Sequence, residues 1–144
     1  MIVVDVNLLL YVYDAASEHH AMAKAWWEQR LTGTEAVALP SHTILGFLRV
    51  GTSSKILRYP LTTLEASQIV QEWLECPVVC LIDSEPDHWV LFFRLLAAHQ
   101  IRGNLVPDAH LAALAIARGA ELCSSDQDFT RFTGLRWVNP LSRT

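Results

Sequence analysis

Short apolar runs alternate along the chain with longer segments in which apolar residues recur at helical spacing. The uninterrupted apolar runs predict five strands, at Ile2–Val4, Ala36–Leu39, Val78–Ile82, Leu122–Ser124 and Arg136–Val138. The amphipathic segments between them predict helices at Glu18–Leu31, His42–Thr52, Leu64–Glu75, Asp87–His99 and Asp108–Arg118.

Capping residues mark several of these helix boundaries. Ser41 is suited to cap the helix that follows it, and the segment Thr62–Glu65 (TTLE) fits a capping box. Pro107 is typical of a first helical position, and Gly119 is typical of the residue just beyond a helix end. The boundaries therefore agree with the apolar pattern.

The order of these elements indicates the fold class. Strands that alternate with helices form a parallel sheet, and strands without polar alternation are covered on both faces. Right-handed crossovers then give an α/β fold, a three-layer α/β/α sandwich with a mainly parallel sheet of about five strands. The 144 residues contain no internal repeat or long linker, so we expect a single domain over residues 1–144. Ligands in such folds bind beyond the carboxyl ends of the strands.

Composition narrows the class of protein. Apolar residues make up 51% of the chain, but no apolar run approaches the roughly 18 residues that span a bilayer. The first residues lack the basic segment and cleavage site of a signal peptide, so we expect a cytoplasmic protein without membrane association. The net charge of −4 argues against a polybasic surface that coats nucleic acid, although it allows a local basic groove or an acidic metal site.

Three carboxylates lie where the chain is expected to leave the sheet. Asp5 follows the first strand directly, Asp126 follows the fourth, and Asp108 begins a helix after a short apolar segment. Because the carboxyl ends of parallel strands share one edge, the three side chains are expected to converge there. Structural roles are the alternative, since aspartate also favours helix N-termini, as at Asp108, and turns, as at Asp126 and Asp128.

Converging carboxylates repel one another unless a cation compensates them. No Lys or Arg lies within a few positions of Asp5 or Asp108. Hard cations such as Mg²⁺ and Mn²⁺ prefer carboxylate ligands, polarise phosphoryl oxygens and activate water. The pattern therefore predicts metal-dependent hydrolysis of a phosphodiester.

Three segments of the chain carry a resemblance to a known family. DVNLLLY, NLVPDAHLAALAIARGAELCSSDQDF and LRWVNP resemble PIN-domain ribonucleases, and in particular the VapC toxins of the subgroup abundant in mycobacteria. The resemblance covers essentially the whole chain. It implies a PIN-like fold and a Mg²⁺- or Mn²⁺-dependent endoribonuclease toxin of a type II toxin–antitoxin system. Such a toxin acts on tRNA or rRNA, inhibits translation and growth until a cognate VapB-type antitoxin blocks it, and forms a homodimer.

The resemblance also assigns roles to individual residues. Asp5, Asp108 and Asp126 are implied to be the catalytic metal ligands, with Asp128 as an auxiliary acid. Asn7, in the motif Asp-x-Asn, is implied to orient Asp5 through a hydrogen bond.

One family feature is missing from the helix expected after the second strand. Most PIN domains carry a glutamate there, whereas this chain has Gly46 and no acid between Ala36 and Leu64. We therefore expect one firmly bound ion with a second recruited by RNA phosphates. The alternative is a catalytically weak or dead PIN-like protein that only binds RNA or a partner.

Other residues are candidates for contacts with metal-bound water or substrate. Asn104 and His110 lie near Asp108, and Arg49 lies one helical turn beyond Gly46, where it could contact an RNA phosphate. Further candidate backbone contacts are Lys55, Arg58 and Arg102.

Other acid-containing α/β proteins fit the sequence less well. A receiver domain needs a late lysine, and this chain has none after Lys55. A haloacid-dehalogenase-like phosphatase needs Asp-x-Asp at the first strand, where this chain has Asp5 and Asn7. A phosphate-binding G-x-x-x-x-G-K-[ST] loop is absent from the sequence.

Overall fold

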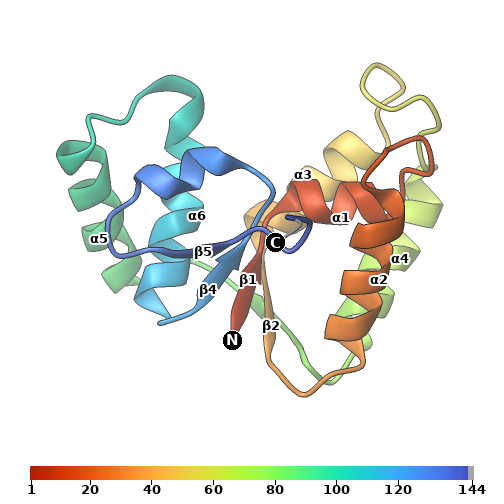
Figure 1. Cartoon of the computed structure of the whole chain (residues 1–144), viewed down its shortest axis with the longest axis horizontal. Helices are drawn as coiled ribbons and strands as arrows, with labels where there is room; N and C mark the ends of the chain where they lie inside the picture. The colour runs from red at the N-terminus through yellow and green to blue at the C-terminus, as the bar shows by residue number, and fades with distance from the viewer. Residues whose placement is uncertain (143–144) are drawn as a thin grey trace.

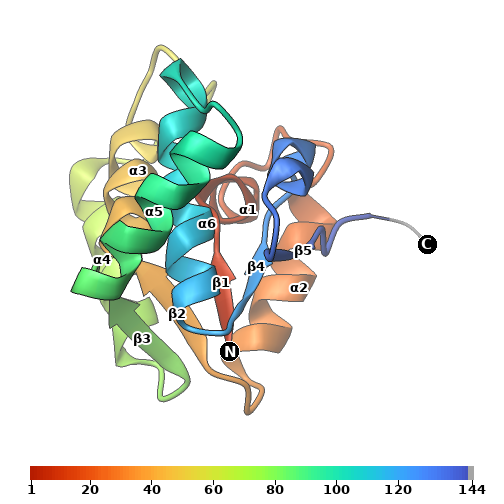
Figure 2. The same ribbon diagram turned by 90° about the vertical axis from the view of Figure 1, so that its left-hand side faces the viewer.

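A parallel five-stranded sheet forms the centre of the protein, as a computed structural model of residues 1–142 describes it. Residues 143 and 144, the end of the domain expected from the sequence, lie outside the described residues. The strand order is β3-β2-β1-β4-β5, and the strands fan across the molecule in that order in Figure 2. Their bounds are β1 Ile2–Val4, β2 Val37–Pro40, β3 Val79–Ile82, β4 Glu121–Cys123 and β5 Arg136–Val138.

Helices cover both faces of this sheet, which confirms the predicted α/β/α sandwich. Helices α1 to α4 pack on one face, and α5 and α6 pack on the other (Figure 1). Two 3₁₀ turns, η1 and η2, precede α6 and follow β4. The helical bounds are α1 Val6–Val12, α2 His20–Leu31, α3 Ser41–Gly51, α4 Thr63–Glu75, α5 Pro86–Ala98, η1 Gly103–Leu105, α6 Val106–Ala117 and η2 Gln127–Arg131.

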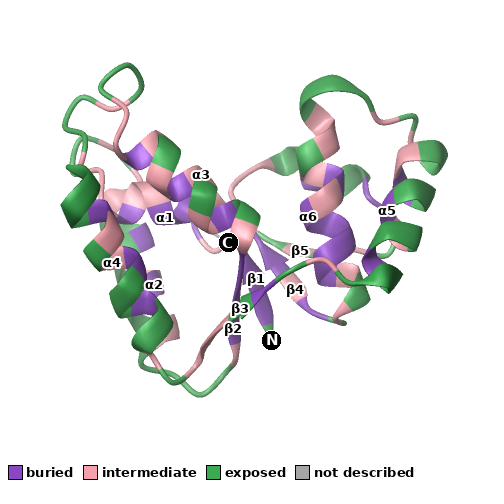
Figure 3. Ribbon diagram, turned by 180° about the vertical axis from the view of Figure 1, so that it is seen from behind, coloured by how far each residue is buried: buried purple, intermediate pink, exposed green. Residues whose placement is uncertain are grey.

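Alternation along the strands divides the core into two clusters. Val4 faces the cluster that contains Trp27 and Trp73, whereas Val3 faces the cluster of α5 and α6. Successive strand residues point to opposite faces, so a strand that is apolar throughout is buried on both sides. Figure 3 shows β1 buried along its length, while the outer faces of the helices are exposed.

The predicted elements are largely confirmed, with one helix missed. Each strand lies within one residue of its predicted bounds, and the capping box of Thr62 and Glu65 is present. Gly119 has the left-handed φ of +61° just beyond α6. Ser41, the predicted N-cap, is instead the first residue of α3, and Pro40 occupies the N-cap position. The helix α1 was not predicted, because its run of apolar residues shows no polar face; the cap from Asp5 and burial against the sheet stabilise it.

Strand register brings the carboxyl ends of the central strands together. Val3 pairs with Ala38 of β2, and Val4 pairs with Cys123 of β4. The backbone N–H of Asp5 donates to the carbonyl of Cys123 at 3.0 Å, so the two chains leave the sheet side by side. Within the described part of the chain, no helix is long and apolar enough to cross a membrane.

Candidate metal centre

Asp5 is the first carboxylate at this edge, and both of its oxygens are engaged. It is the N-cap of α1, and its Oδ1 accepts a hydrogen bond from the Val6 N–H at 2.8 Å. The Ser124 hydroxyl donates to Oδ2 at 2.6 Å. Burial raises the pKa of Asp5 above its ordinary value, although these two hydrogen bonds oppose the rise. Asp5 therefore lies in an apolar segment because it caps α1 and accepts a hydrogen bond from Ser124, the residue that follows β4.

Ser124 is the centre of the hydrogen-bond network around Asp5. Its side chain is buried, and its Oγ also accepts from Asn7 Nδ2 at 3.3 Å and from the Asp126 N–H at 3.0 Å. Asn7 thus contacts Asp5 through Ser124 rather than directly. Among the described residues, the buried Oδ1 of Asn7 has no hydrogen-bond partner. Sequence reasoning missed Ser124, although a serine two residues before Asp126 at a strand end was an available signal.

Three carboxylates gather at one point beside this network. Asp108, Asp126 and Asp128 each offer an oxygen, and these oxygens lie within 4.8 Å of one another. Asp126 caps η2 by accepting from the Asp128 N–H at 2.8 Å, which fixes the two acids relative to each other. The predicted auxiliary acid Asp128 is thus a full member of the group. Asp5 lies outside this tight group but close enough for its charge to act on Asp108.

The electrostatics of the group indicate uncompensated negative charge. Burial, and after it the negative charges of Asp126, Asp5 and Asp128, together raise the pKa of Asp108 from 3.8 to about 6. Arg131 opposes this rise, and its guanidinium pairs with Asp128 at 3.3 Å. Carboxylate oxygens are the ligands that Mg²⁺ and Mn²⁺ prefer, so the donor set fits such an ion.

The position of Asp108 differs from the expectation in one respect. It does not follow a strand: it lies in the first turn of α6, which follows η1 and the preceding helix α5. The acid still reaches the shared edge because α6 begins at that end of the sheet (Figure 1). Asn104 lies in η1 and is exposed, and no hydrogen bond joins its side chain to a described residue.

His110 is packed among aromatic rings rather than placed within the carboxylate group. Its ring centroid lies 4.6 Å from that of His88 and 5.6 Å from that of His42. Burial lowers the pKa of His110 to about 4, so its ring is neutral at physiological pH. A packing role therefore accounts for His110.

Helix α3 contributes basic groups to this edge instead of a carboxylate. A Cβ at Gly46 would meet the side chain of Val6 at 3.4 Å, so this position faces α1 beside Asp5. Arg49 is exposed one turn further along. His42, in the first turn of α3, was missed as a candidate, although it lies close enough to Asp5 to oppose, when protonated, the raised pKa of that acid.

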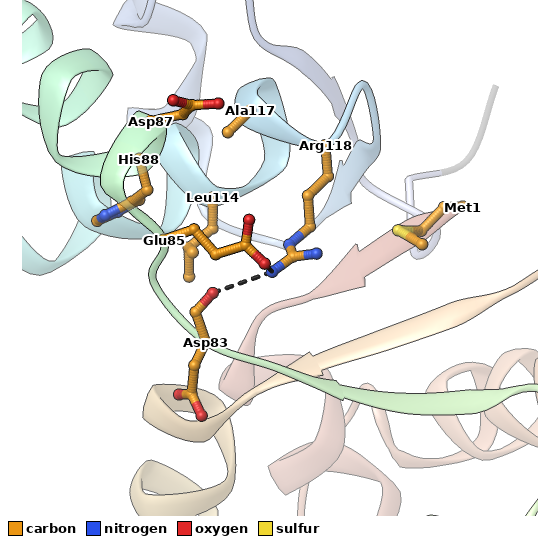
Figure 4. A pocket seen from close by; sticks show the side chains of 8 residues that line it. All are labelled: Met1, Asp83, Glu85, Asp87, His88, Leu114, Ala117 and Arg118. Carbon is orange, nitrogen blue, oxygen red and sulfur yellow. Dashed lines mark hydrogen bonds and ion pairs between the residues drawn. The ribbon is translucent and has the colours of Figure 1, made fainter.

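A cavity among the described residues lies away from the carboxylate group. It has a volume of about 320 Å³ and is lined by residues that include Asp83, Glu85 and Arg118. Figure 4 shows the guanidinium of Arg118 turned toward Glu85 and toward the backbone carbonyl of Asp83, at 3.9 and 3.0 Å. The carboxylates of Asp83 and Asp87 point away from it. None of the three site acids lines this cavity, so the carboxylate group remains the candidate site.

Comparison with known proteins shows the family to which this chain belongs. A family profile described as the PIN domain matches residues 2–135. The chain belongs to the PIN-domain family. This PIN domain is 40% identical over 141 residues to Ribonuclease VapC33 of Mycobacterium tuberculosis, a match that covers 98% of this chain and 99% of the relative. It is also 37% identical over 140 residues to Ribonuclease VapC37 of the same species, covering 97% of each chain.

Solved structures share the fold of this PIN domain. VapBC2 from Rickettsia felis, solved bound to a promoter DNA fragment, has a TM-score of 0.71 at 19% identity and covers 96% of this chain and 98% of its own. VapC20 of Mycobacterium tuberculosis, described as a toxin that cleaves the sarcin–ricin loop, has a TM-score of 0.68 at 20% identity and covers 94% and 99%. The PIN-like fold and the VapC resemblance predicted from the sequence are confirmed.

Proposed function

We propose that this protein is a Mg²⁺- or Mn²⁺-dependent endoribonuclease, the toxin of a type II toxin–antitoxin pair. It hydrolyses phosphodiester bonds of a structured RNA, tRNA or rRNA, and a VapB-type antitoxin blocks it. The observation that carries the proposal is the group formed by Asp108, Asp126 and Asp128 in a chain whose relatives are named ribonucleases.

The four acids divide into two roles in this reaction. Asp108, Asp126 and Asp128 would hold the ion, and Asp5 adds negative charge from the end of β1. When bound, such an ion polarises a phosphoryl oxygen and lowers the pKa of bound water. Ser124 fixes the orientation of Asp5 and the start of η2 through its three hydrogen bonds. The products are expected to carry a 5′-phosphate and a 3′-hydroxyl.

Recognition of RNA must come from binding, because a water nucleophile makes no use of the 2′-hydroxyl. Sequence-specific RNA recognition targets loops and unstacked bases more than regular helices. The loops of folded tRNA or rRNA are therefore expected to be better substrates than regular duplex RNA.

Protein partners are proposed from the relatives and from one exposed surface. Several structural neighbours were solved as VapBC complexes, which supports a VapB-type antitoxin as the natural inhibitor.

The homodimer stays a prediction. Trp89, Val90 and Phe93 form an exposed apolar stripe on α5 that a second copy would cover. Light scattering of wild type beside Phe93→Ser tests this, since loss of the stripe is expected to convert a dimer to a monomer.

The decisive experiment is cleavage of total cellular RNA by the purified protein with Mg²⁺, with Mn²⁺ and with EDTA. Asp108→Asn and Asp126→Asn are expected to abolish discrete, metal-dependent fragments, and Asp5→Asn is expected to abolish or strongly reduce them. Asp83→Asn, an exposed acid outside the group, serves as the matched control. A folded protein that binds Mn²⁺ but cleaves nothing would instead support the binding-only alternative built on Gly46.

A further inference from the structure

One face of α3 carries an exposed histidine near its start, an exposed arginine near its end and a glycine between them, with the exposed side chain of Leu45 beside the glycine. His42, Gly46 and Arg49 follow the spacing i, i+4, i+7, which places them on the same side of the helix. His42 and Arg49 are both exposed. Seven residues of helix separate them by about 10 Å along the axis.

The first turn of α3 is anchored against the strand that carries Asp5. The buried hydroxyl of Thr43 donates to the carbonyl of Val4 at 2.9 Å. This bond holds the backbone of His42 next to the end of β1. His42 in its protonated form would lower the pKa of Asp5, which agrees with this placement.

The ring of His42 packs against the protein on one side and is exposed to solvent on the other. It packs edge to face on His110, with centroids 5.6 Å apart and planes at 71°. His110 is held in turn by His88, whose Nε2 lies 3.2 Å from the His110 carbonyl oxygen. The inner two rings are buried or half-buried, so only His42 presents an edge to solvent.

Gly46 has no side chain, so the backbone of α3 lies close to the helix surface at this position. A Cβ there would contact only the side chain of Val6, at ordinary van der Waals distance. A glycine at such a point allows a ligand backbone to approach the helix closely. No carboxylate occurs between residues 36 and 64, so nothing in this segment repels an anion.

We propose that His42, Gly46 and Arg49 form a track that holds RNA phosphates beside the metal centre. His42 donates a hydrogen bond to the phosphate nearest the carboxylates, and Arg49 binds a phosphate further along the strand. The histidine and arginine side chains offer hydrogen-bond donors to a phosphodiester backbone, and Gly46 adds no negative charge between them, whereas a glutamate at position 46 would recruit a further cation. The inference rests on the proposed function for its substrate, but its binding step needs no catalysis.

The test measures RNA binding separately from cleavage. Fluorescence anisotropy of a labelled single-stranded RNA is recorded in EDTA for wild type, His42→Ala, Arg49→Ala and the double variant. Each single variant is expected to weaken binding about tenfold, as loss of a charge-assisted hydrogen bond does. For Arg49→Ala the slope of log affinity against log salt should fall by about 0.7. His19→Ala, at the N-cap of α2, and Arg94→Ala, on α5, are controls and should bind RNA as wild type does.

A second pair of measurements separates a contact with RNA from an indirect effect. His42→Gln keeps a hydrogen-bond donor and is expected to recover most of the lost affinity. Calorimetric Mn²⁺ affinity should not be weaker for His42→Ala than for wild type, because the substitution removes no metal ligand. Far-UV circular dichroism and thermal melts confirm that each variant is folded.

The outcomes distinguish this inference from the proposed function. Unchanged RNA affinity in both single variants overturns the track, even where Asp108→Asn abolishes cleavage. Unchanged RNA affinity together with weaker antitoxin binding would assign the face of α3 to the antitoxin and would also overturn it. Conversely, weakened RNA binding in a protein that cleaves no RNA leaves the track standing and overturns the nuclease.

Discussion

Replacing Asp108 by asparagine should stabilise the metal-free protein while abolishing its activity. The carboxyl group has its pKa raised from 3.8 to about 6 because burial and three neighbouring acids disfavour its charge. Each pKa unit corresponds to about 1.4 kcal/mol, so burial and the neighbouring charges together destabilise the charged carboxylate at pH 8 by at most about 3 kcal/mol. Asp108 is only half-buried, so solvent screening reduces this figure. The N-terminus of α6 also favours the charge by some tenths of a kcal/mol, which leaves about 1 kcal/mol.

The pH dependence gives the sign of the effect. The native carboxyl group binds its proton more tightly than the unfolded chain does, so wild type without metal loses stability as pH rises from about 4 to about 6. Asp108→Asn lacks this titration. Its melting temperature in EDTA should therefore exceed that of wild type by about 3 °C at pH 8. Near pH 4 the difference should shrink toward zero.

Scanning calorimetry in EDTA, and then in Mn²⁺, measures both consequences. Added Mn²⁺ should reverse the order, because only wild type gains the free energy of binding the ion at full strength. Asp83→Asn, an exposed acid outside the group, should change neither melting curve. A destabilised Asp108→Asn at pH 8 in EDTA, or a stabilisation that persists at pH 4, would refute the electrostatic account of the site.

Three further substitutions test the supports of the site. Ser124→Ala removes the donor to Asp5 and leaves two half-buried donors without their acceptor, so urea unfolding should show a loss of about 2 kcal/mol and RNA cleavage should fall. Gly46→Ala places a methyl group at ordinary contact distance in a helix, so it should raise stability by up to about 1 kcal/mol; a clear loss would contradict the packing described there. Thr43→Val removes the bond to the Val4 carbonyl and should cost about 1–2 kcal/mol in the same assay, with weaker RNA binding as the first turn of α3 shifts.

Local sequence signals predicted most of the fold correctly. The apolar runs located the strands to within one residue, and the capping box at Thr62 formed as expected. Each of these depends on neighbours within a few positions, which a single sequence displays. Helix α1 was missed because its seven residues carry too little periodicity to separate a short buried helix from a loop or strand.

The candidate site was predicted in part. Asp5 and Asp126 were expected at strand ends and lie there, while Asp108 reaches the same edge from the start of a helix. The membership of Asp128 in the tight carboxylate group follows from the cap that Asp126 makes at η2. His42 was not predicted, because only the packing of α3 against β1 brings it near Asp5.

The sequence alone determined most of the elements and the fold class, and it predicted the type of chemistry, because periodicity, capping and residue type are local properties. The tertiary structure decided which side chains meet. The bond from Ser124 to Asp5 joins residues 119 positions apart, and it exists because parallel crossovers bring the ends of β1 and β4 to one edge of the sheet. No local pattern specifies such a pair, since its partners meet only when both faces of the sheet are buried beneath helices.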